Sequence, residues 1–273
     1  KWLGSDSSNY YNSYDLKSES GWGELMGLIQ TLNSDFDNLG EVLNIDRVLW
    51  AFAVNSAILN LDTYNGYYIH NFYLYQTEDG LFQMIPWDFD NAFAGAILGW
   101  EYFEPELVYN FDTYGTQFTP NERPLLQKLL AEPLYKKQFD AHLRTILNES
   151  LLDTASIRDD VSQLHDVAYN AVLEDNNKAF SMTQFSSNVE DDLWTNWGFG
   201  GIMSMVDARN NYLAGLSTMA MPRPEISNMT LSNGILTVDV SLASQVDVMA
   251  TTSVHNSKFE TFAMYDDGTN GDL

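Results

Sequence analysis

A helix pattern that is apolar on nearly all sides, followed by an aromatic hairpin pattern, limits the fold of this chain more than any other feature. Apolar residues between Ile45 and Leu61 recur around the whole helical projection, which predicts a helix buried at the centre of a domain. Residues 71–76 and 81–86 are aromatic and β-branched, and an Asp-Gly turn signal separates them. The two patterns predict an α+β fold that is mainly helical and contains a β-hairpin.

Further helices are predicted on both sides of this region. Apolar spacing of three or four residues also covers residues 22–32, a segment that begins at Leu39, and residues 123–152, 157–173 and 202–216. The helical pattern stops at Pro222 and Pro224, where two prolines in three residues predict a stiff, extended linker. We therefore expect one helical domain over residues 1–220. Its first 20 residues form an irregular arm before the first helix.

The last part of the chain, residues 221–273, has strand character. Residues 231–240 combine a Ser-Asn-Gly turn with period-two alternation, and residues 246–250 and 259–265 continue in the same style. A segment of about 50 residues can build only a small core. We expect a β-sandwich-like module of the bacterial immunoglobulin-like type that is incomplete or that packs on the first domain.

The charge balance excludes several classes of partner. The chain has 38 Asp and Glu against 13 Lys and Arg, a formal net charge of -25. Such a chain repels nucleic acid phosphates and anionic lipid surfaces, so neither is an expected partner. No apolar run approaches the 18 or so residues of a membrane-spanning helix, and with no cysteine there are no disulfides and no thiolate chemistry. An anionic substrate would need a metal ion to neutralise the local field.

Carboxylates next to the hairpin are the candidates for such a metal site. Asp62 follows the buried helix, and Asp88 and Asp90 follow a strand that ends in Ile-Pro-Trp. In extended chain, side chains two residues apart point to opposite faces, so both can reach one ion only if the backbone turns there. Asn91 and Gly95 favour such a turn, and carboxylate and Asn oxygens suit Mg²⁺. The alternative is that Asp88 only caps a following helix.

The run His70–Phe93, "HNFYLYQTEDGLFQMIPWDFDNAF", resembles the signature of the CotH kinase family, which is named for a spore-coat protein. The shared pattern is Asn-aromatic-x-Leu-Tyr, a turn, and Pro-Trp-Asp-x-Asp-x-x-Phe. The segment around Arg123-Pro124 and a closing helix with Arg209 and Tyr212 fit as well, so the resemblance covers about residues 10–216. It implies the helical lobe of an atypical protein-kinase fold, with the hairpin at the active site. It also implies transfer of the ATP γ-phosphoryl group to Ser or Thr of extracellular or surface proteins.

The resemblance also implies roles for individual residues. Asp62 would be the catalytic-loop residue that orients or deprotonates the substrate hydroxyl. Asp88 would be the second catalytic carboxylate and the principal ligand of Mg²⁺ or Mn²⁺, with Asn71 and Asp90 assisting at the metal. Trp87, together with Asn71, would lie at the nucleotide.

One departure from the family pattern supports a second hypothesis. Family members carry a β-rich lobe with a phosphate-clamping Lys before this region, whereas only about 20 residues precede the first predicted helix here. Half of the electrostatic clamp on ATP would then have to come from another chain or segment. The alternative is a non-catalytic secreted protein that serves surface assembly or adhesion on the CotH scaffold.

Two further expectations concern the surroundings of the protein. The family resemblance, the absence of cysteine and the acidity favour an extracellular or cell-surface location. The segment from Asp266 to Asp272 alternates acids and Asn with Gly, in the manner of a calcium loop, although a turn without metal gives the same pattern.

Overall fold

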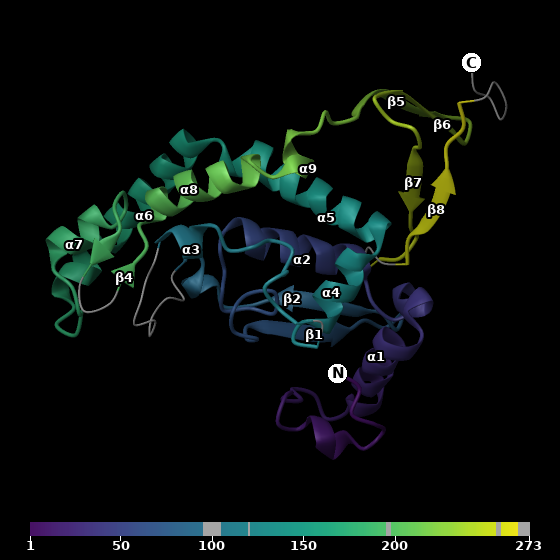
Figure 1. The fold of residues 1–273 in the computed structure, drawn as a ribbon, viewed down its shortest axis with the longest axis horizontal. Helices are drawn as coiled ribbons and strands as arrows, with labels where there is room; N and C mark the ends of the chain where they lie inside the picture. Colours follow the sequence, from purple (N-terminus) through teal and green to yellow (C-terminus); the bar gives the residue numbers. More distant parts are fainter. Residues whose placement is uncertain (95–104, 120, 195–197, 255–257, 267–273) are drawn as a thin grey trace. The chain divides into compact units, whose positions relative to one another are not determined.

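The computed structural model describes residues 1–94, 105–119, 121–194, 198–254 and 258–266. It divides the chain into two compact units, Lys1–Met219 and Ala220–Leu273 (Figure 1). The first unit is mainly helical and also contains two short antiparallel sheets, so the predicted α+β class is confirmed. None of the helices within the described ranges combines the length and the apolar character that crossing a membrane requires.

The first unit runs from short helical turns into longer helices around one hairpin. Its helices are α1 (Trp22–Ser34), α2 (Ile45–Ala57), α3 (Pro105–Tyr109), α4 (Pro124–Ala131), α5 (Pro133–Ile146), α6 (Thr154–Glu174), α7 (Met182–Ser187), α8 (Ile202–Ala214) and α9 (Ser217–Ala220). Its strands are β1 (Phe72–Gln76), β2 (Phe82–Pro86), β3 (Leu193–Trp194) and β4 (Gly198–Phe199). Single turns are η1 (Ser7–Tyr10), η2 (Phe36–Glu41), η3 (Phe89–Asn91) and the π-helical η5 (Leu147–Leu151).

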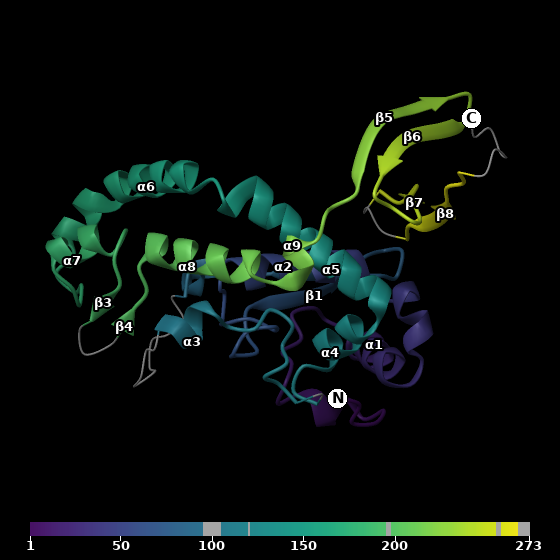
Figure 2. The same ribbon diagram turned by 45° about the horizontal axis from the view of Figure 1, so that its top comes forward.

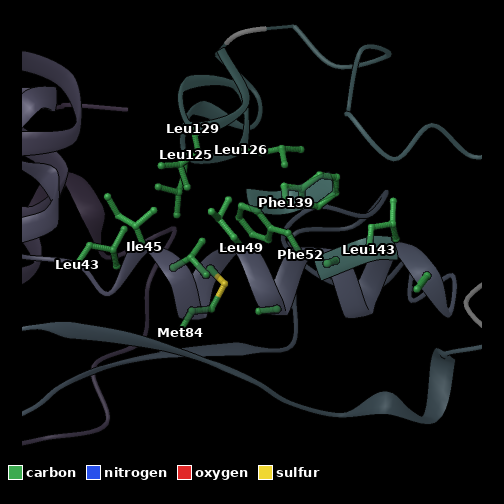
Figure 3. Close-up of a cluster of buried hydrophobic side chains, with 14 of the residues drawn as sticks. Leu43, Ile45, Leu49, Phe52, Met84, Leu125, Leu126, Leu129, Phe139 and Leu143 are labelled. Carbon is green, nitrogen blue, oxygen red and sulfur yellow. The ribbon is translucent and has the colours of Figure 1, made fainter. Parts of the chain in front are cut away.

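Helix α2 is the centre of the main core, as its sequence predicts. The Asn44 side chain caps its first turn by accepting a hydrogen bond from the backbone N–H of Arg47. Val48, Leu49 and Phe52 are fully buried, and α2 packs against both α5 and β2. Figure 3 shows the apolar side chains that meet around α2, which come from the segment before it, from β2, from α4 and from α5. Burial of each such Leu or Phe side chain contributes about 1.5–3 kcal/mol.

The β1–β2 hairpin is also confirmed. Strands β1 and β2 are antiparallel, with Leu74 opposite Met84 and Tyr73 opposite Ile85. Leu74 and Met84 face the core, whereas Tyr73 and Ile85 face solvent, so one face of the hairpin packs on the core and the other is open to solvent around Tyr73 and Ile85. Gln83, also on this second face, is buried. Gly80 in the turn has φ +86°, the left-handed conformation that the Asp-Gly signal predicts. The segment before α2 joins this sheet through a parallel bridge between Leu43 and Phe82.

Several predicted helix bounds are wrong for identifiable reasons. The helix expected from Leu39 is the short 3₁₀ turn η2. Helix α2 ends at Ala57, not at residue 61, and Leu59 adopts φ 50°. The helix expected over 123–152 is two helices, since Glu132 precedes Pro133 and takes the extended conformation that a following proline favours. The N-terminal arm is irregular but anchored, because Tyr10 is buried against α1.

Helix α8 is joined to the rest of the first unit by a buried guanidinium. Arg209 is fully buried and donates to three backbone carbonyls. Its Nε and Nη2 donate to Ser56 O at 3.0 and 2.7 Å, and its Nη1 donates to Tyr109 O at 3.1 Å and to Phe111 O at 2.7 Å. Burial lowers the pKa of Arg209 to about 10, so it is still charged at neutral pH. One side chain thus closes the C-terminal end of α2 against α3 and α8.

The second unit contains two separate hairpins. Strands β5 (Glu225–Ser232) and β6 (Ile235–Ser241) pair in one sheet, and β7 (Asp247–Ala250) and β8 (Glu260–Ala263) pair in another. The strand character expected after residue 230 is confirmed, but β5 already begins at Glu225. The two sheets share no strand pairing within the described residues, so an immunoglobulin-like sandwich stays a prediction. The suggested calcium loop lies outside the described residues except for Asp266.

The first prediction concerns Arg209. Replacing Arg209 by Met leaves three buried carbonyls without a donor, so we expect a loss of about 3–5 kcal/mol in the free energy of unfolding of the first unit. The matched control is Arg158→Met, because Arg158 pairs with Glu190 on the surface and such pairs contribute about 0–1 kcal/mol. Urea unfolding followed by circular dichroism measures both. Equal losses in the two variants would contradict the role given to Arg209.

Candidate active site

The loop that follows α2 is built to fix Asp62. The Asn60 side chain is buried, and its amide donates to Asn55 Oδ1 at 3.2 Å. The Asn60 backbone N–H also donates to Asn55 O at 2.9 Å. The Asn60 side-chain oxygen in turn accepts from the backbone N–H of Asp62 at 3.3 Å. This short polar chain connects the last turn of α2 to the backbone of Asp62, which therefore has a fixed place relative to the core.

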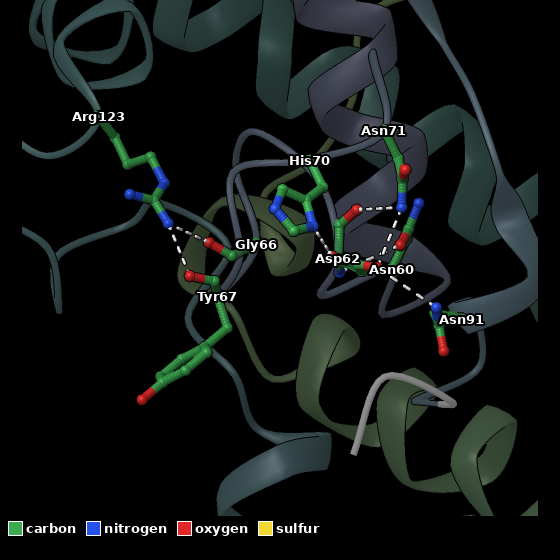
Figure 4. Close-up of polar contacts among 8 residues, drawn as sticks. All are labelled: Asn60, Asp62, Gly66, Tyr67, His70, Asn71, Asn91 and Arg123. Carbon is green, nitrogen blue, oxygen red and sulfur yellow. Dashed lines mark hydrogen bonds and ion pairs between the residues drawn. The ribbon is translucent and has the colours of Figure 1, made fainter. Parts of the chain in front are cut away.

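The Asp62 carboxylate lies in a ring of polar groups (Figure 4). The Asn71 amide donates to Asp62 Oδ2 at 3.0 Å and to Asp62 O at 3.1 Å, and the Asn91 amide donates to Oδ2 at 3.3 Å. His70 Nδ1 lies 3.2 Å from Oδ1. The Asp62 side chain is 17% exposed, so it is partly shielded but open to a substrate. Asn71 has φ 55°, a conformation that Asn tolerates well and that turns its amide toward Asp62.

Arg123 holds the far side of the same loop. Its Nη2 donates to Gly66 O at 2.8 Å and to Tyr67 O at 2.9 Å, and its guanidinium lies over the Phe118 ring at 4.3 Å. Gly66 is required there, because a Cβ at this position would lie 2.3 Å from the carbonyl oxygen of Leu61. Burial lowers the pKa of Arg123. The loop that carries Asp62, His70 and Asn71 is therefore fixed at both ends.

The chain turns sharply after β2, as a shared metal site requires. Asp88 has φ 52° and ψ 76°, and the 3₁₀ turn η3 follows at once. Asp88 forms no side-chain cap on this turn, so the capping alternative does not account for its carboxylate. Asp90 interacts with Asp88 and also lies in the field of Asp62. Its pKa is raised, first by desolvation and then by the charge of Asp88 and a hydrogen bond with it.

These three carboxylates form one acidic neighbourhood, but only part of a metal site. Asp88 and Asp90 are both exposed, and their repulsion is the kind that a divalent cation relieves. Within the described ranges, no three His, Asp or Glu side chains converge on one point as ready ligands. Two neighbouring carboxylates suit a hard cation that completes its shell with water or phosphate oxygens, the usual habit of Mg²⁺.

Trp87 lies beside these carboxylates on the solvent-exposed face of the β1–β2 hairpin. Its backbone N–H donates to Asn71 O at 2.9 Å, which extends the β1–β2 ladder by one pair. The Trp87 side chain is 56% exposed, and its ring meets Tyr73 edge to face at 5.4 Å. An exposed, flat aromatic surface is thus available next to Asn71.

The structure brings most of the sequence-derived candidates together. Asp62 and Asn71 are hydrogen-bonded, Asp88 and Asp90 interact, and Trp87 pairs with Asn71 through the backbone. Sequence reasoning did not assign a site role to Asn91, His70, Asn60 or Arg123. Asn91 stands within the aspartate motif, which could have suggested it, whereas the other three depend on how the loop folds.

Comparison with known proteins identifies the family. A family model described as CotH kinase protein matches residues 1–193. That match covers most of the chain, and the chain therefore belongs to the CotH kinase family, as the resemblance implies. The matched region contains Asp62, Asn71, Asp88 and Asp90 and ends before α8. Neither the curated proteins nor the solved structures gave a match.

The second prediction tests the Arg123 clamp. Arg123→Lys keeps a charge but loses the Nη1 donor to Glu122 O and the planar group that lies over the Phe118 ring, so we expect a loss of about 1–3 kcal/mol in unfolding free energy. Hydrogen exchange of the backbone amides of residues 62–71 should speed up more than that of α5. The control is Arg158→Lys on the surface. Unchanged exchange in the loop would show that Arg123 does not hold it.

The third prediction concerns alkaline pH. Tyr64 is half-buried, stacks on Phe52 and accepts a hydrogen bond from Leu125 N at 3.0 Å, and desolvation raises its pKa above the ordinary value near 10. Above pH 10 the unfolded chain releases this proton while the folded chain keeps it. The unfolding free energy therefore falls as pH rises.

Tyr64→Phe removes that proton difference. The decline above pH 10 should become shallower by up to about 1.4 kcal/mol per pH unit. The control for the substitution itself is Tyr75→Phe, because Tyr75 is 57% exposed. Urea unfolding at a series of pH values measures the slopes, and parallel slopes for wild type and Tyr64→Phe would refute the assignment.

Proposed function

We propose that this protein is a metal-dependent phosphotransferase on an atypical kinase-like fold, which moves the γ-phosphoryl group of ATP to a Ser or Thr hydroxyl of a protein. The observation that carries the proposal is the oriented Asp62 carboxylate next to the repelling pair Asp88 and Asp90. Membership of the CotH kinase family supports ATP and a divalent cation in general terms.

Asp62 is the residue that handles the substrate hydroxyl. Two amide donors hold its Oδ2, and Oδ1 faces His70, so the carboxylate keeps one orientation. In the transfer, the hydroxyl oxygen forms a bond to the γ-phosphorus, and the bond from that phosphorus to the β–γ bridging oxygen breaks. The hydroxyl proton passes to Asp62 and ADP leaves. Positioning of this kind supplies most of the catalysis in phosphoryl transfer.

Asp88 and Asp90 are the residues that would hold Mg²⁺ or Mn²⁺. The Asn71 amide nitrogen is engaged with Asp62, so the Asn71 oxygen is the atom that can face a cation. The bound ion would neutralise phosphate charge, which a chain of net charge -25 otherwise repels. Trp87 offers its exposed ring for stacking on the adenine.

A non-catalytic surface-assembly or adhesion protein is the second candidate. One observation favours it: within the described ranges the acidic side chains do not form a ready three-ligand metal site. In either case the partner would be a protein at the cell surface or outside the cell. The spore-coat association of the family and the absence of cysteine support this location.

The fourth prediction separates the two candidates. Mn²⁺ with ATP at 100 times its dissociation constant should stabilise the chain by about 2.7 kcal/mol, which a thermal shift detects. Asp88→Asn and Asp90→Asn should abolish the shift and also the transfer of labelled γ-phosphate to protein. The matched control is the double variant Asp159→Asn, Asp160→Asn, which removes two exposed acids from α6.

A further variant distinguishes binding from chemistry. Asp62→Asn should retain the nucleotide-dependent shift and lose phosphate transfer, because Asp62 acts on the hydroxyl and does not bind the metal. No shift and no transfer with wild-type protein that is folded by circular dichroism would favour the assembly protein.

A further inference from the structure

A cavity of about 380 Å³ lies in the α6–α7–α8 region of the first unit, within the part of the chain that the structure describes. Figure 2 shows α6 and α8 joined at one end through α7 and the β3–β4 hairpin. Apolar side chains from all of these elements line the cavity, among them Leu164, Phe180, Phe185 and Ile202. This volume lies within the range of about 300–1,000 Å³ that is typical of ligand pockets.

The walls of the cavity are partly ordered by aromatic stacking. The His165 ring stacks on Phe185 with centroids 4.6 Å apart and an interplanar angle of 17°, and Phe180 stacks on the same Phe185 ring at 6.2 Å. His165 Nε2 lies 3.3 Å from Ser186 Oγ. One wall is therefore held in place by side chains, although α7 is only six residues long.

Helix α6 leaves apolar surface uncovered around this cavity. None of its 21 residues is buried. Leu164, which lines the cavity, is 68% exposed, and Leu173 further along the helix is 50% exposed. Apolar side chains at such exposure next to a concave apolar surface are typical of interaction sites.

The charge around the cavity limits what can bind there. Residues 154–193 contain eight Asp and Glu but only one Arg and one Lys, and six of the acids remain when Glu190, which pairs with Arg158, and Asp192, which accepts from Gly201 and Ser204, are set aside. Arg158 is already paired with Glu190, and the Lys178 ammonium donates to the carbonyls of Leu173 and Asp175. The surroundings therefore favour a cationic partner. They disfavour a second copy of this chain and an anionic lipid, which carry charge of the same sign.

We propose that this cavity is a docking site for a segment of a partner protein that inserts a large apolar side chain and carries Lys or Arg beside it. The apolar side chain would fill the space between Leu164, Phe180 and Ile202, and the cations would face the acids of α6. Docking here needs no phosphotransfer at Asp62, so the two proposals stand separately.

The test uses the full chain and a labelled peptide, Lys-Lys-Leu-Phe-Lys-Lys, with fluorescence anisotropy as the readout. We expect saturable binding that weakens as salt screens the charges. Two peptides serve as comparisons, Glu-Glu-Leu-Phe-Glu-Glu and Lys-Lys-Ser-Gly-Lys-Lys, and both should bind at least tenfold more weakly. If either comparison peptide bound as tightly as Lys-Lys-Leu-Phe-Lys-Lys, the proposal would be overturned. Binding would then depend on the apolar side chains alone or on the charges alone.

Matched variants of α6 locate the site. Leu164→Asn should weaken binding of the peptide about tenfold, which corresponds to about 1.4 kcal/mol. Val167→Asn should leave it within twofold, because Val167 is 83% exposed and does not line the cavity. Filling the cavity by Ala168→Phe should also weaken binding, whereas Ala155→Phe should not, because Ala155 is exposed in the first turn of α6 and does not line the cavity. Equal effects within either pair would overturn the proposal.

Sedimentation of the unliganded chain tests the other occupant. We expect a monomer over the concentrations used for peptide binding. A dimer that Leu164→Asn dissociates would show that the cavity is filled by a second copy, and it would overturn docking of a cationic segment.

Discussion

The pairing of buried guanidinium groups with backbone carbonyls is the interaction on which the rest of this structure depends. Arg209 closes the end of α2 against α3 and α8, and Arg123 holds the loop that returns from α2 to β1. Both groups lie in the interior, where an unpaired carbonyl costs about 1–3 kcal/mol. The position of Asp62 follows from these two contacts, because its loop starts near one of them and is held by the other.

The sequence predicts the parts of the fold that local patterns control. The central helix is recognisable because apolar residues occupy all its sides, and the hairpin because Asp-Gly separates two aromatic strands. The bounds of α4 and α5 were missed because spacing alone does not show that Pro133 forces Glu132 out of the helical conformation. The short helix α7 is not predicted by the sequence pattern, because its six residues contain too few apolar positions to show a helical period.

The candidate site, like the fold, could be predicted only in part from the sequence. The aspartate motif after β2 and Asp62 after α2 could be selected from the sequence, since carboxylates next to apolar elements are unusual. The left-handed turn at Asp88 and the contact of Asn91 with Asp62 could not, because both depend on how chain segments about 30 residues apart meet. His70 is exposed, yet its ring nitrogen lies against Asp62. The contact forms because the loop between α2 and β1 folds back on itself.

The choice of carbonyls as partners for Arg123 and Arg209 has a consequence for how this protein can change over evolutionary time. In many proteins an interior cation is matched by an interior acid, so a mutation of either one must be compensated by the other. Here the matching groups belong to the main chain and are present whatever the side chain. Acids can therefore accumulate or disappear on the outside without disturbing the framework, and a wide range of surface charge is compatible with one architecture.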